Sequence, residues 1–574
     1  MGIFSSVPKP KVKRSVFGKS LTYENKLSFD FGMIVPIMAK DLLPGDNFYY
    51  SPEVFLRCAP LIAPMMQLCD VHIDVFKFPF RLLMRDSPGT PGFETFISPK
   101  DIFGDGVQPN MTAFEFEMTS DDKTDLEKFF APGTLSDYLG IPTIDSNFGS
   151  VTYSGQSMKF RALDHIAYQW AFDEFYRNEN IQDPILDEDT DFQPQIISDV
   201  DDAEKFMMLR YRNWSKDYFT SALPNTQRGI DVGIPITADV PISYVKPTPD
   251  DIVAGDITQI RQIYGTEASP GNNLQLGTLS DSSDPNFDAW YLGSAASGVT
   301  DSFDVDNSKR LVGHLSNVVA TINDLRLSVA LQAWAEASMR GGARYPEILM
   351  STFGVRPRDS RLQRPECMGR VSFPLQISEV LQTSQTDTTP QGNMSGRGIA
   401  YGRGRYIHIY AEEHCIVHAY LSVMPRAAYQ QGLPKRYTKF DKFDYYWPQF
   451  DALGEQAIAD RELFYDFNTD WNDSTTNDHA FGYQQRYCEY KAFPSEIHGD
   501  FKLPGLNAWH MSRIFASAPG LNENFVSYEG ELDSMNQRIF ASGSTNRSHL
   551  WCQILNRIRA KRPMSYQVIP HLKG

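Results

Sequence analysis

Residues 71–80, VHIDVFKFPF, form the stretch that decides the fold class. Val71, Ile73 and Val75 recur at every second position, and His72 and Asp74 lie between them. Because side chains of a β-strand point alternately to its two faces, this pattern predicts a half-buried strand. We therefore expect a fold that is built on β-sheet.

Further strand-like segments are spread along the chain at long intervals. They are residues 27–33, 368–382, 405–423, 486–493 and 548–560. The chain has 39 glycines, 36 prolines and 13% aromatic residues, a composition that favours many turns. This pattern predicts a mainly β protein, a sandwich in which large loops outweigh the framework.

Two longer helices are expected between these strands. Residues 323–341 place Leu327, Leu331 and Trp334 on one face, before a glycine pair that ends the helix. We interpret this segment as a core helix that serves packing. Residues 160–181 predict the second helix, and TLSDYLGIP at 134–142 predicts a short helix that stops at its glycine.

The charge of the chain is distributed unevenly. The formal net charge of the 574 residues is −17, yet residues 1–23 carry +5 and residues 547–574 carry +6. Without these two ends, the remainder carries −28. Basic ends on an acidic body suggest that the ends face a polyanion, although simple solvation explains basic tails equally well.

Residues 231–306 differ from the rest in composition. They contain twelve acidic residues against Lys246 and Arg261, a net charge of −10. Connections of this length inside a domain are usually functional or disordered. We expect a surface insertion that leaves the body and returns to it near residue 323.

The basic ends supply the candidate nucleic-acid contacts, because Lys and Arg neutralise phosphates largely irrespective of sequence. The candidates are Lys9, Lys11, Lys13, Arg14, Lys19, Arg557, Arg559, Lys561 and Arg562. Phe17, Trp551 and Tyr566 lie near them and are of a type that stacks on unpaired bases. At its strand-like position, however, Trp551 is more readily interpreted as a core residue.

No catalytic, cofactor or metal site is predicted. GRGIAYGRGR at 396–405 lacks the ending of a phosphate-binding loop and precedes a strand, so we interpret it as a flexible loop. His408, His414 and His418 have the same parity, but about 13 Å would separate the last two in one strand, too far for a shared zinc ion. The six cysteines form no C-x-x-C pair and are expected to be free thiols in a reducing cytoplasm.

A set of short blocks, in order along almost the whole chain, resembles the major capsid proteins of the Microviridae, small phages with single-stranded DNA, and in particular the gokushovirus branch. The blocks are MIVPI (33–37), LLPGDNF (42–48), APLIAPMM (59–66), FKFPFRLL (76–83), LSDYLGIP (135–142), YRNENI (176–181), LRYRNWSKDYFTSALPNTQRG (209–229), INDLRL (322–327), RGGARYPE (340–347), FGYQQRYCEYK (481–491), HGDF (498–501), LNENFV (521–526) and CQILNRIRAKRPM (552–564).

The resemblance implies a viral jelly roll, an eight-stranded antiparallel β-sandwich with very large interstrand loops. It implies self-assembly, in the host cytoplasm, of a T=1-type icosahedral shell around a circular single-stranded DNA genome. Its implied partners are further copies of the chain, a pilot protein, a small basic protein and a receptor on the bacterial host. The body would comprise residues 27–230 and 307–574, residues 1–26 an internal basic arm, and 231–306 a protrusion near the three-fold axes for host attachment.

Two other functions remain open at this stage. A carbohydrate-binding, lectin-like β-sandwich would need a sugar site that is lined by exposed aromatic residues. A metal-assisted hydrolase would need His408, His414 and His418 to converge. The N-terminus has no apolar run after its basic residues and no window is long enough to span a membrane, so a soluble chain is expected.

Overall fold

A computed structural model gives the architecture of this chain. It describes residues 13–87, 90–91, 112–117, 128–143, 157–228, 242–244, 274–280, 288–294, 311–313, 322–342, 344–356, 358–381, 394–471, 476–541 and 548–567. Contacts divide the chain into two compact units. The first unit comprises Met1–Arg228 and Ala335–Gly574, and the second comprises Gly229–Trp334.

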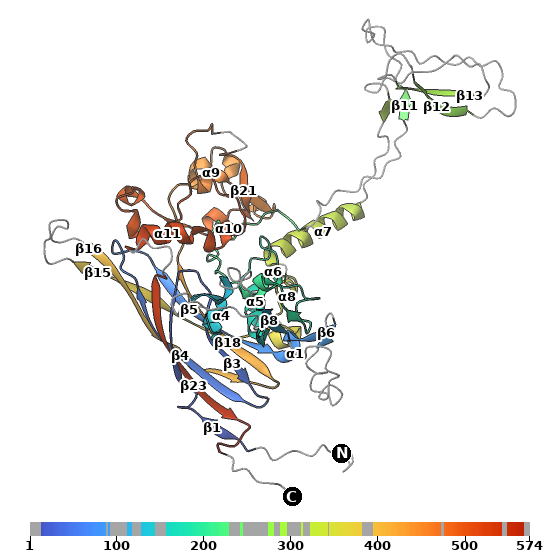
Figure 1. Cartoon of the computed structure of the whole chain (residues 1–574). Helices are drawn as coiled ribbons and strands as arrows, with labels where there is room; N and C mark the ends of the chain where they lie inside the picture. Colours follow the sequence, from blue (N-terminus) through green and yellow to red (C-terminus); the bar gives the residue numbers. More distant parts are fainter. Residues whose placement is uncertain are drawn as a thin grey trace. The chain divides into compact units, whose positions relative to one another are not determined.

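The first unit is built on antiparallel strands that form two joined sheets (Figure 1). The strands are β1 (Ser15–Phe17), β2 (Tyr23–Phe29), β3 (Val35–Leu42), β4 (Asn47–Cys58), β5 (Cys69–Pro79), β15 (Glu366–Leu381), β16 (Met394–Arg403), β17 (Ile407–Tyr410), β18 (Cys415–Pro425) and β23 (Leu550–Arg562). Sheet I contains β1, β2, β23, β4, β17, β16 and residues 376–381 of β15. Sheet II contains residues 366–375 of β15 with β5, β18 and β3.

The two sheets face each other across the main core. Most alternate residues of β4 and β23 in sheet I, and of β5 and β18 in sheet II, are buried in one apolar cluster. Val54 and Ile554 enter it from sheet I, and Val71 and Leu421 enter it from sheet II. The mainly β fold and the antiparallel sandwich predicted from the sequence are thereby confirmed.

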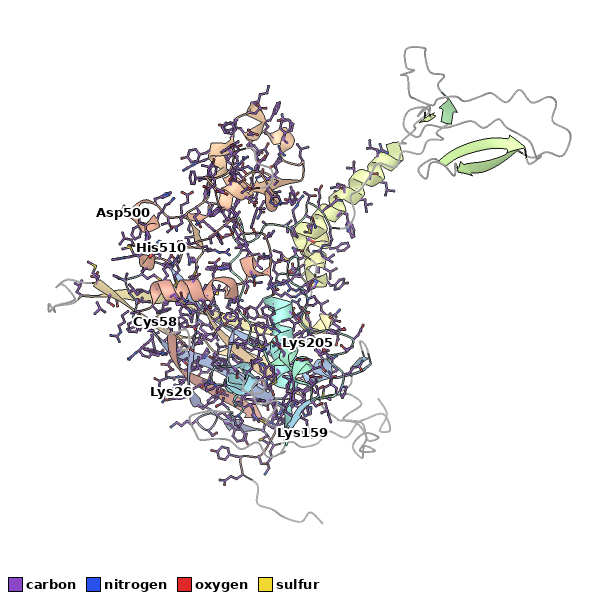
Figure 2. All side chains as sticks on the ribbon, turned by 45° about the horizontal axis from the view of Figure 1, so that its top comes forward. Lys26, Cys58, Lys159, Lys205, Asp500 and His510 are labelled. Atoms are coloured by element: carbon purple, nitrogen blue, oxygen red, sulfur yellow. The ribbon has the colours of Figure 1, made fainter. Side chains whose placement is uncertain are left out.

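A second core covers the outer side of sheet II. Phe76, Phe78 and Tyr420 point away from the main core and pack beneath the helix α5 (Leu163–Phe175). The strands β8 (Ala113–Glu117) and β9 (Ser157–Arg161) and the helix α6 (Val200–Met207) complete this layer. Lys159 of β9 and Lys205 of α6 mark the layer in Figure 2.

The predicted half-buried strand at 71–80 is therefore buried on both faces. Asp74, which was expected on a polar side, and Phe76, two positions farther on the same side, are each 1% exposed. The pattern was misleading because Asp74 is a buried ion-pair partner: its carboxylate accepts a hydrogen bond from Tyr176 and faces Arg212. A buried carboxylate is tolerated where it is paired in this way.

Further strands and α-helices lie in the described part of the chain. The strands are β6 (Arg85–Ser87), β7 (Thr90–Pro91), β10 (Ile196–Ile197), β11 (Ile242–Tyr244), β12 (Leu274–Ser280), β13 (Asp288–Ser294), β14 (Leu311–Gly313), β19 (Ala428–Tyr429), β20 (Glu455–Ala459), β21 (Ala480–Gln485) and β22 (Ser495–Glu496). The helices are α1 (Phe80–Leu83), α4 (Leu135–Leu139), α7 (Ile322–Gly341), α8 (Tyr345–Phe353), α9 (Asp460–Leu463), α10 (Glu523–Val526) and α11 (Leu532–Ile539).

The helix predicted at 323–341 exists as α7, but its expected role is wrong. Leu327, Leu331 and Trp334, the supposed core face, are 69%, 47% and 57% exposed. The division between the two units falls inside this helix, and its buried residues in the first unit include Ala335 and Met339. Amphipathic spacing gives the face of a helix, but not whether another part of the chain covers that face.

Two other segments differ from their predicted structure. Residues 396–405, expected to be a loop, lie mostly in β16, where a Cβ at Gly402 would come within 2.5 Å of the Phe373 ring. The glycine there permits close packing and does not mark a flexible loop. Residues 486–493, expected to be a strand, contain a 3₁₀ turn at Cys488–Tyr490.

Candidate nucleic-acid interface

The two basic ends of the chain meet at one edge of sheet I. β1 pairs antiparallel with the end of β23, so that Ser15 lies opposite Arg562 and Phe17 opposite Ala560. β2 pairs with the earlier part of the same strand. Figure 1 shows β1 beside the end of β23, next to β4. Two segments at opposite ends of the sequence therefore form one surface.

Half of the described part of the predicted arm at residues 1–26 is strand. Ser15–Phe17 and Tyr23–Phe29 are hydrogen-bonded to β23. Lys13, Arg14 and Lys19 are exposed along it. The remaining two N-terminal candidates, Lys9 and Lys11, lie outside the described residues.

The four C-terminal candidates divide into paired and exposed cations. Arg557 forms an ion pair of 2.5 Å with Glu53, and Arg562 approaches the buried Asp46 at 3.5 Å. Burial raises the pKa of Asp46. Arg559 and Lys561 are exposed. These two side chains therefore offer their charges most directly to an anion.

Alternation along β23 explains this arrangement. Leu550, Ile554 and Ala560 have even numbers and are buried in the main core, whereas Arg559 and Lys561 point to the other side. Trp551 shares their parity and is 50% exposed, so the interpretation of this residue as core is wrong. The residues on either side of it, Leu550 and Cys552, point into the core and are buried.

Neighbouring strands extend this surface, and Arg57, Tyr49 and Tyr401 are among its residues that sequence reasoning missed. In an antiparallel sheet, side chains of directly opposite residues project from the same face. The register places Arg57 opposite Trp551 and Tyr49 opposite Arg559.

We call this outer side of sheet I the basic-aromatic face. Its charged residues are Lys26, Arg57, Arg397, Arg403, Arg557, Arg559 and Lys561 with Glu24 and Glu53, and its rings are Tyr49, Phe55, Tyr401, His408, Tyr410 and Trp551.

The basic-aromatic face has a charge opposite to that of the whole chain. Seven cations and two carboxylates give it a net charge of +5, on a protein whose net charge is −17. Glu53 lies among the cations, where the Tyr401 hydroxyl donates to it at 2.7 Å. This hydrogen bond, and then Arg557, hold the pKa of Glu53 below its ordinary value. Glu53 therefore stays ionised and neutralises part of the face.

The rings of this face are held by their neighbours. The guanidinium of Arg57 lies 4.9 Å from the centre of the Phe55 ring, and Tyr49 stacks on His408 with 4.6 Å between ring centres. Tyr401 is 64% exposed although its hydroxyl is bonded to Glu53. Phe17 stacks on Tyr566 at 5.4 Å, so these two predicted rings contact each other. Figure 2 labels Lys26 of β2 and Cys58 of β4, two residues of sheet I.

His408 and His418, which the hydrolase alternative requires to converge, lie on different sheets. His408 lies on the exposed face beside Tyr49, whereas His418 is buried on the other sheet between Tyr420 and Asp164. Within the described ranges, no group of three or more His, Cys, Asp or Glu side chains is arranged to hold a metal ion. Nor does any described helix have the length and apolar character to cross a membrane.

The second unit carries the described part of the acidic insertion. β11 pairs with β14, and β12 pairs with β13 along seven residue pairs. The pairing of β11 with β14 at 311–313 joins residues on both sides of residue 306, which was the predicted end of the insertion. The compact unit accordingly runs to Trp334, farther than the predicted end of the insertion.

Comparison with known proteins gives the family. A family model described as "Capsid protein (F protein)" matches residues 5–572. Capsid protein VP1 of Chlamydia phage 1 is 31% identical over an alignment of 609 residues in length, which covers 99% of this chain and 97% of that protein. Capsid protein VP1 of Bdellovibrio phage phiMH2K is 32% identical over 535 residues, covering 91% and 89%, and that of Spiroplasma virus 4 is 25% identical over 567 residues, covering 95% and 93%.

These matches confirm the resemblance to capsid proteins of gokushovirus-type Microviridae. The chain therefore belongs to the phage capsid protein family, and its role in the virion is structural rather than enzymatic.

Proposed function

We propose that this chain forms a T=1 icosahedral shell around a circular single-stranded DNA genome, with its sandwich in jelly-roll connectivity. The observation that carries the proposal is the basic-aromatic face, a net positive surface on an acidic capsid protein. Lys and Arg bind phosphates by displacing their counterions. The predicted cations, including Arg559 and Lys561, accordingly face the genome from inside the shell.

Exposed aromatic residues on the loops support contacts between copies in the shell. Phe440, Tyr445 and Trp447 are 77%, 52% and 46% exposed in a segment of short 3₁₀ turns between β19 and β20. Contiguous exposed apolar surface typically marks protein–protein contacts. This segment packs against neighbouring subunits, where aromatic side chains supply much of the binding energy.

The acidic insertion contributes to host attachment in this proposal. The second compact unit has strand pairs of its own, which supports a separately folded insertion. A receptor on the bacterial surface is its expected partner. A pilot protein and a small basic protein are further partners of the assembled particle.

The test is to express the full chain in bacteria and examine purified material by negative-stain electron microscopy, with absorbance at 260 and 280 nm. We expect uniform small icosahedral shells that contain nucleic acid. A chain that stays monomeric or dimeric over wide ranges of protein and salt concentration, with phage extracts added, would contradict the proposal.

A matched pair of variants separates assembly from its two proposed accessory roles. Replacing residues 230–321 by a flexible glycine–serine linker removes β11 to β14 together, and shells should still form while binding to host cells is lost. The variant Arg559→Gln with Lys561→Gln should also form shells, but with a lower ratio of absorbance at 260 to 280 nm. Unchanged nucleic-acid content would contradict the assignment of these cations to the genome.

A further inference from the structure

The basic-aromatic face has a regular arrangement across its strands that phosphate binding alone does not explain. One row contains Gln553, Phe55 and Tyr401, from β23, β4 and β16. Two positions farther along the strands, Trp551 and Arg57 form the next row. Successive rows of this kind lie roughly 7 Å apart along a strand. Because Lys26 of β2 lies opposite Gln553, each of these two rows contains both an aromatic ring and a cation.

A second group of rings lies toward the other end of β4. Arg559, Tyr49 and His408 form one row, and Lys561 shares the next row with Tyr410. Tyr49 and Tyr410 are 37% and 43% exposed. Because these side chains stand on hydrogen-bonded strands, their positions are set before any ligand arrives. Such pre-positioned rings lose little conformational entropy on binding.

We propose that the basic-aromatic face is a stacking platform for single-stranded nucleic acid, on which Tyr401 and Trp551 stack with unpaired bases while Arg57, Arg559 and Lys561 bind the phosphates. This inference rests on the proposed function, since the shell brings the genome to this face. It goes beyond that function because it assigns base contacts to named rings. It also predicts a preference for unpaired strands.

Charge and ring exposure favour this occupant over two others. A second copy that met this face with its own equivalent face would bring two net positive surfaces together, which is unfavourable. A DNA duplex would satisfy the cations, but its bases are stacked on one another and cannot cover the rings. A single strand supplies both phosphates and free base faces, and stacking of this kind tolerates any sequence.

The experiment uses the full-length chain before assembly, which is verified by light scattering. Fluorescence anisotropy measures binding of three labelled probes: a 20-nucleotide oligothymidine, an abasic oligonucleotide of equal length, and a 20-base-pair duplex. We expect oligothymidine to bind on the order of 100-fold more tightly than the abasic strand, because Tyr401 and Trp551 each stack a base and each stacked base adds roughly 1–3 kcal/mol. The duplex should not share this advantage.

Ring variants assign the effect to residues. Tyr401→Ala with Trp551→Ala should weaken oligothymidine binding by on the order of 100-fold and change abasic binding by less than about twofold. Tyr401→Phe keeps the ring and should restore most of the affinity that Tyr401→Ala loses. The matched control is Phe467→Ala with Phe493→Ala, two residues that are 89% and 85% exposed outside sheet I, and it should change neither affinity.

Other outcomes would overturn the inference in distinguishable ways. Equal affinity of the unmodified chain for oligothymidine and the abasic strand refutes stacking, and leaves the shell function standing if particles still form and package DNA. Self-association that depends on Tyr401 and Trp551, without oligothymidine binding, assigns the face to a second copy. Failure both to bind any probe and to form particles counts against the proposed function itself.

Discussion

In both sheets of the sandwich, side chains point alternately toward and away from the main core. The outer side of sheet II is buried, however, whereas the outer side of sheet I is exposed. On sheet II, Phe76 and Tyr420 point outward and are buried beneath α5 and its neighbours. On sheet I, Tyr401 and Trp551 point outward and are at least half exposed. Alternation decides which side chains leave the main core. What they meet outside depends on where the long connections of the chain return.

The covering layer of sheet II comes from one continuous part of the chain. β8, β9, α5 and α6 all lie between β5 and residue 228. Sheet I lacks such a layer among the described residues, and its outer side carries the net charge of +5. A sandwich that is covered on one side keeps its other side available for an external partner. The comparison thus links the topology of the loops to the position of the candidate interface.

The largest expected effect compares one ring on each outer side. Phe76→Ala removes a ring that lies 4.7 Å from that of Phe175 and 5.6 Å from that of Tyr420, and should lower the free energy of unfolding by about 3–5 kcal/mol. Tyr401→Ala should cost less than about 1 kcal/mol, since the ring is mostly exposed. Urea unfolding of the unassembled chains measures both. Equal losses would mean that the outer side of sheet I is covered in the folded chain.

The buried carboxylate of Asp74 gives the next effect. Its oxygens accept from Tyr176 at 2.7 Å and face Arg212 at 3.3 Å and also Arg370. Asp74→Asn leaves the guanidinium of Arg212 without its counter-charge, so we expect a loss of about 2–4 kcal/mol in the same assay. Asp70→Asn, which breaks a more exposed pair with Arg426, is the control and should cost less than about 1 kcal/mol. Similar losses in both variants would contradict a special role for burial.

A pH effect should appear in the layer that covers sheet II. Burial lowers the pKa of His165 to about 4, from an ordinary value near 6.5. Between these values the unfolded chain binds a proton that the folded chain does not, so stability is present above pH 6.5 and is lost as the pH falls toward 4. His165→Gln should remove up to about 2 kcal/mol of the stability difference between pH 7 and pH 5. Urea midpoints at both pH values measure it, and an unchanged difference would contradict the assignment.

The framework of the fold was accessible from the sequence because alternation is a local property. It located β5 and β23, the strand that carries Arg559 and Lys561. It also gave the wrong environment for Asp74, since a polar residue in an alternating strand normally faces water. The partners that bury this carboxylate, Tyr176 and Arg212, lie about 100 and 140 positions away in the chain.

The candidate site was predictable only in part, for the same reason. The clusters of Lys and Arg at both ends pointed to a polyanion, but their meeting at β1 and β23 depends on long-range pairing. Arg57 and Tyr401 lie in strands of mixed composition and carry no local signal of binding. The register across sheet I brings them into one surface, and a register between distant strands cannot be read from either strand alone.

The smallest effect, and the one most specific to the basic-aromatic face, is expected from replacing Glu53. Its carboxylate is the acid that pairs with Arg557 and accepts the hydroxyl of Tyr401, and its lowered pKa keeps it charged. Glu53→Gln keeps an acceptor for Tyr401 but releases Arg557 to a phosphate. One more phosphate contact should raise affinity for oligothymidine about two- to fivefold in low salt, and steepen its dependence on the logarithm of salt concentration by about 0.7. Stability should change by less than about 1 kcal/mol, because the pair is partly solvated.

Glu24→Gln, on β2 at the edge of the same face, is the control for simple removal of a negative charge, and should raise affinity without engaging a paired arginine. If Glu53→Gln weakens binding, the Glu53 carboxylate holds Arg557 and Tyr401 in their binding positions. Its main effect would then be to position these side chains, and not to neutralise part of the positive charge of the face.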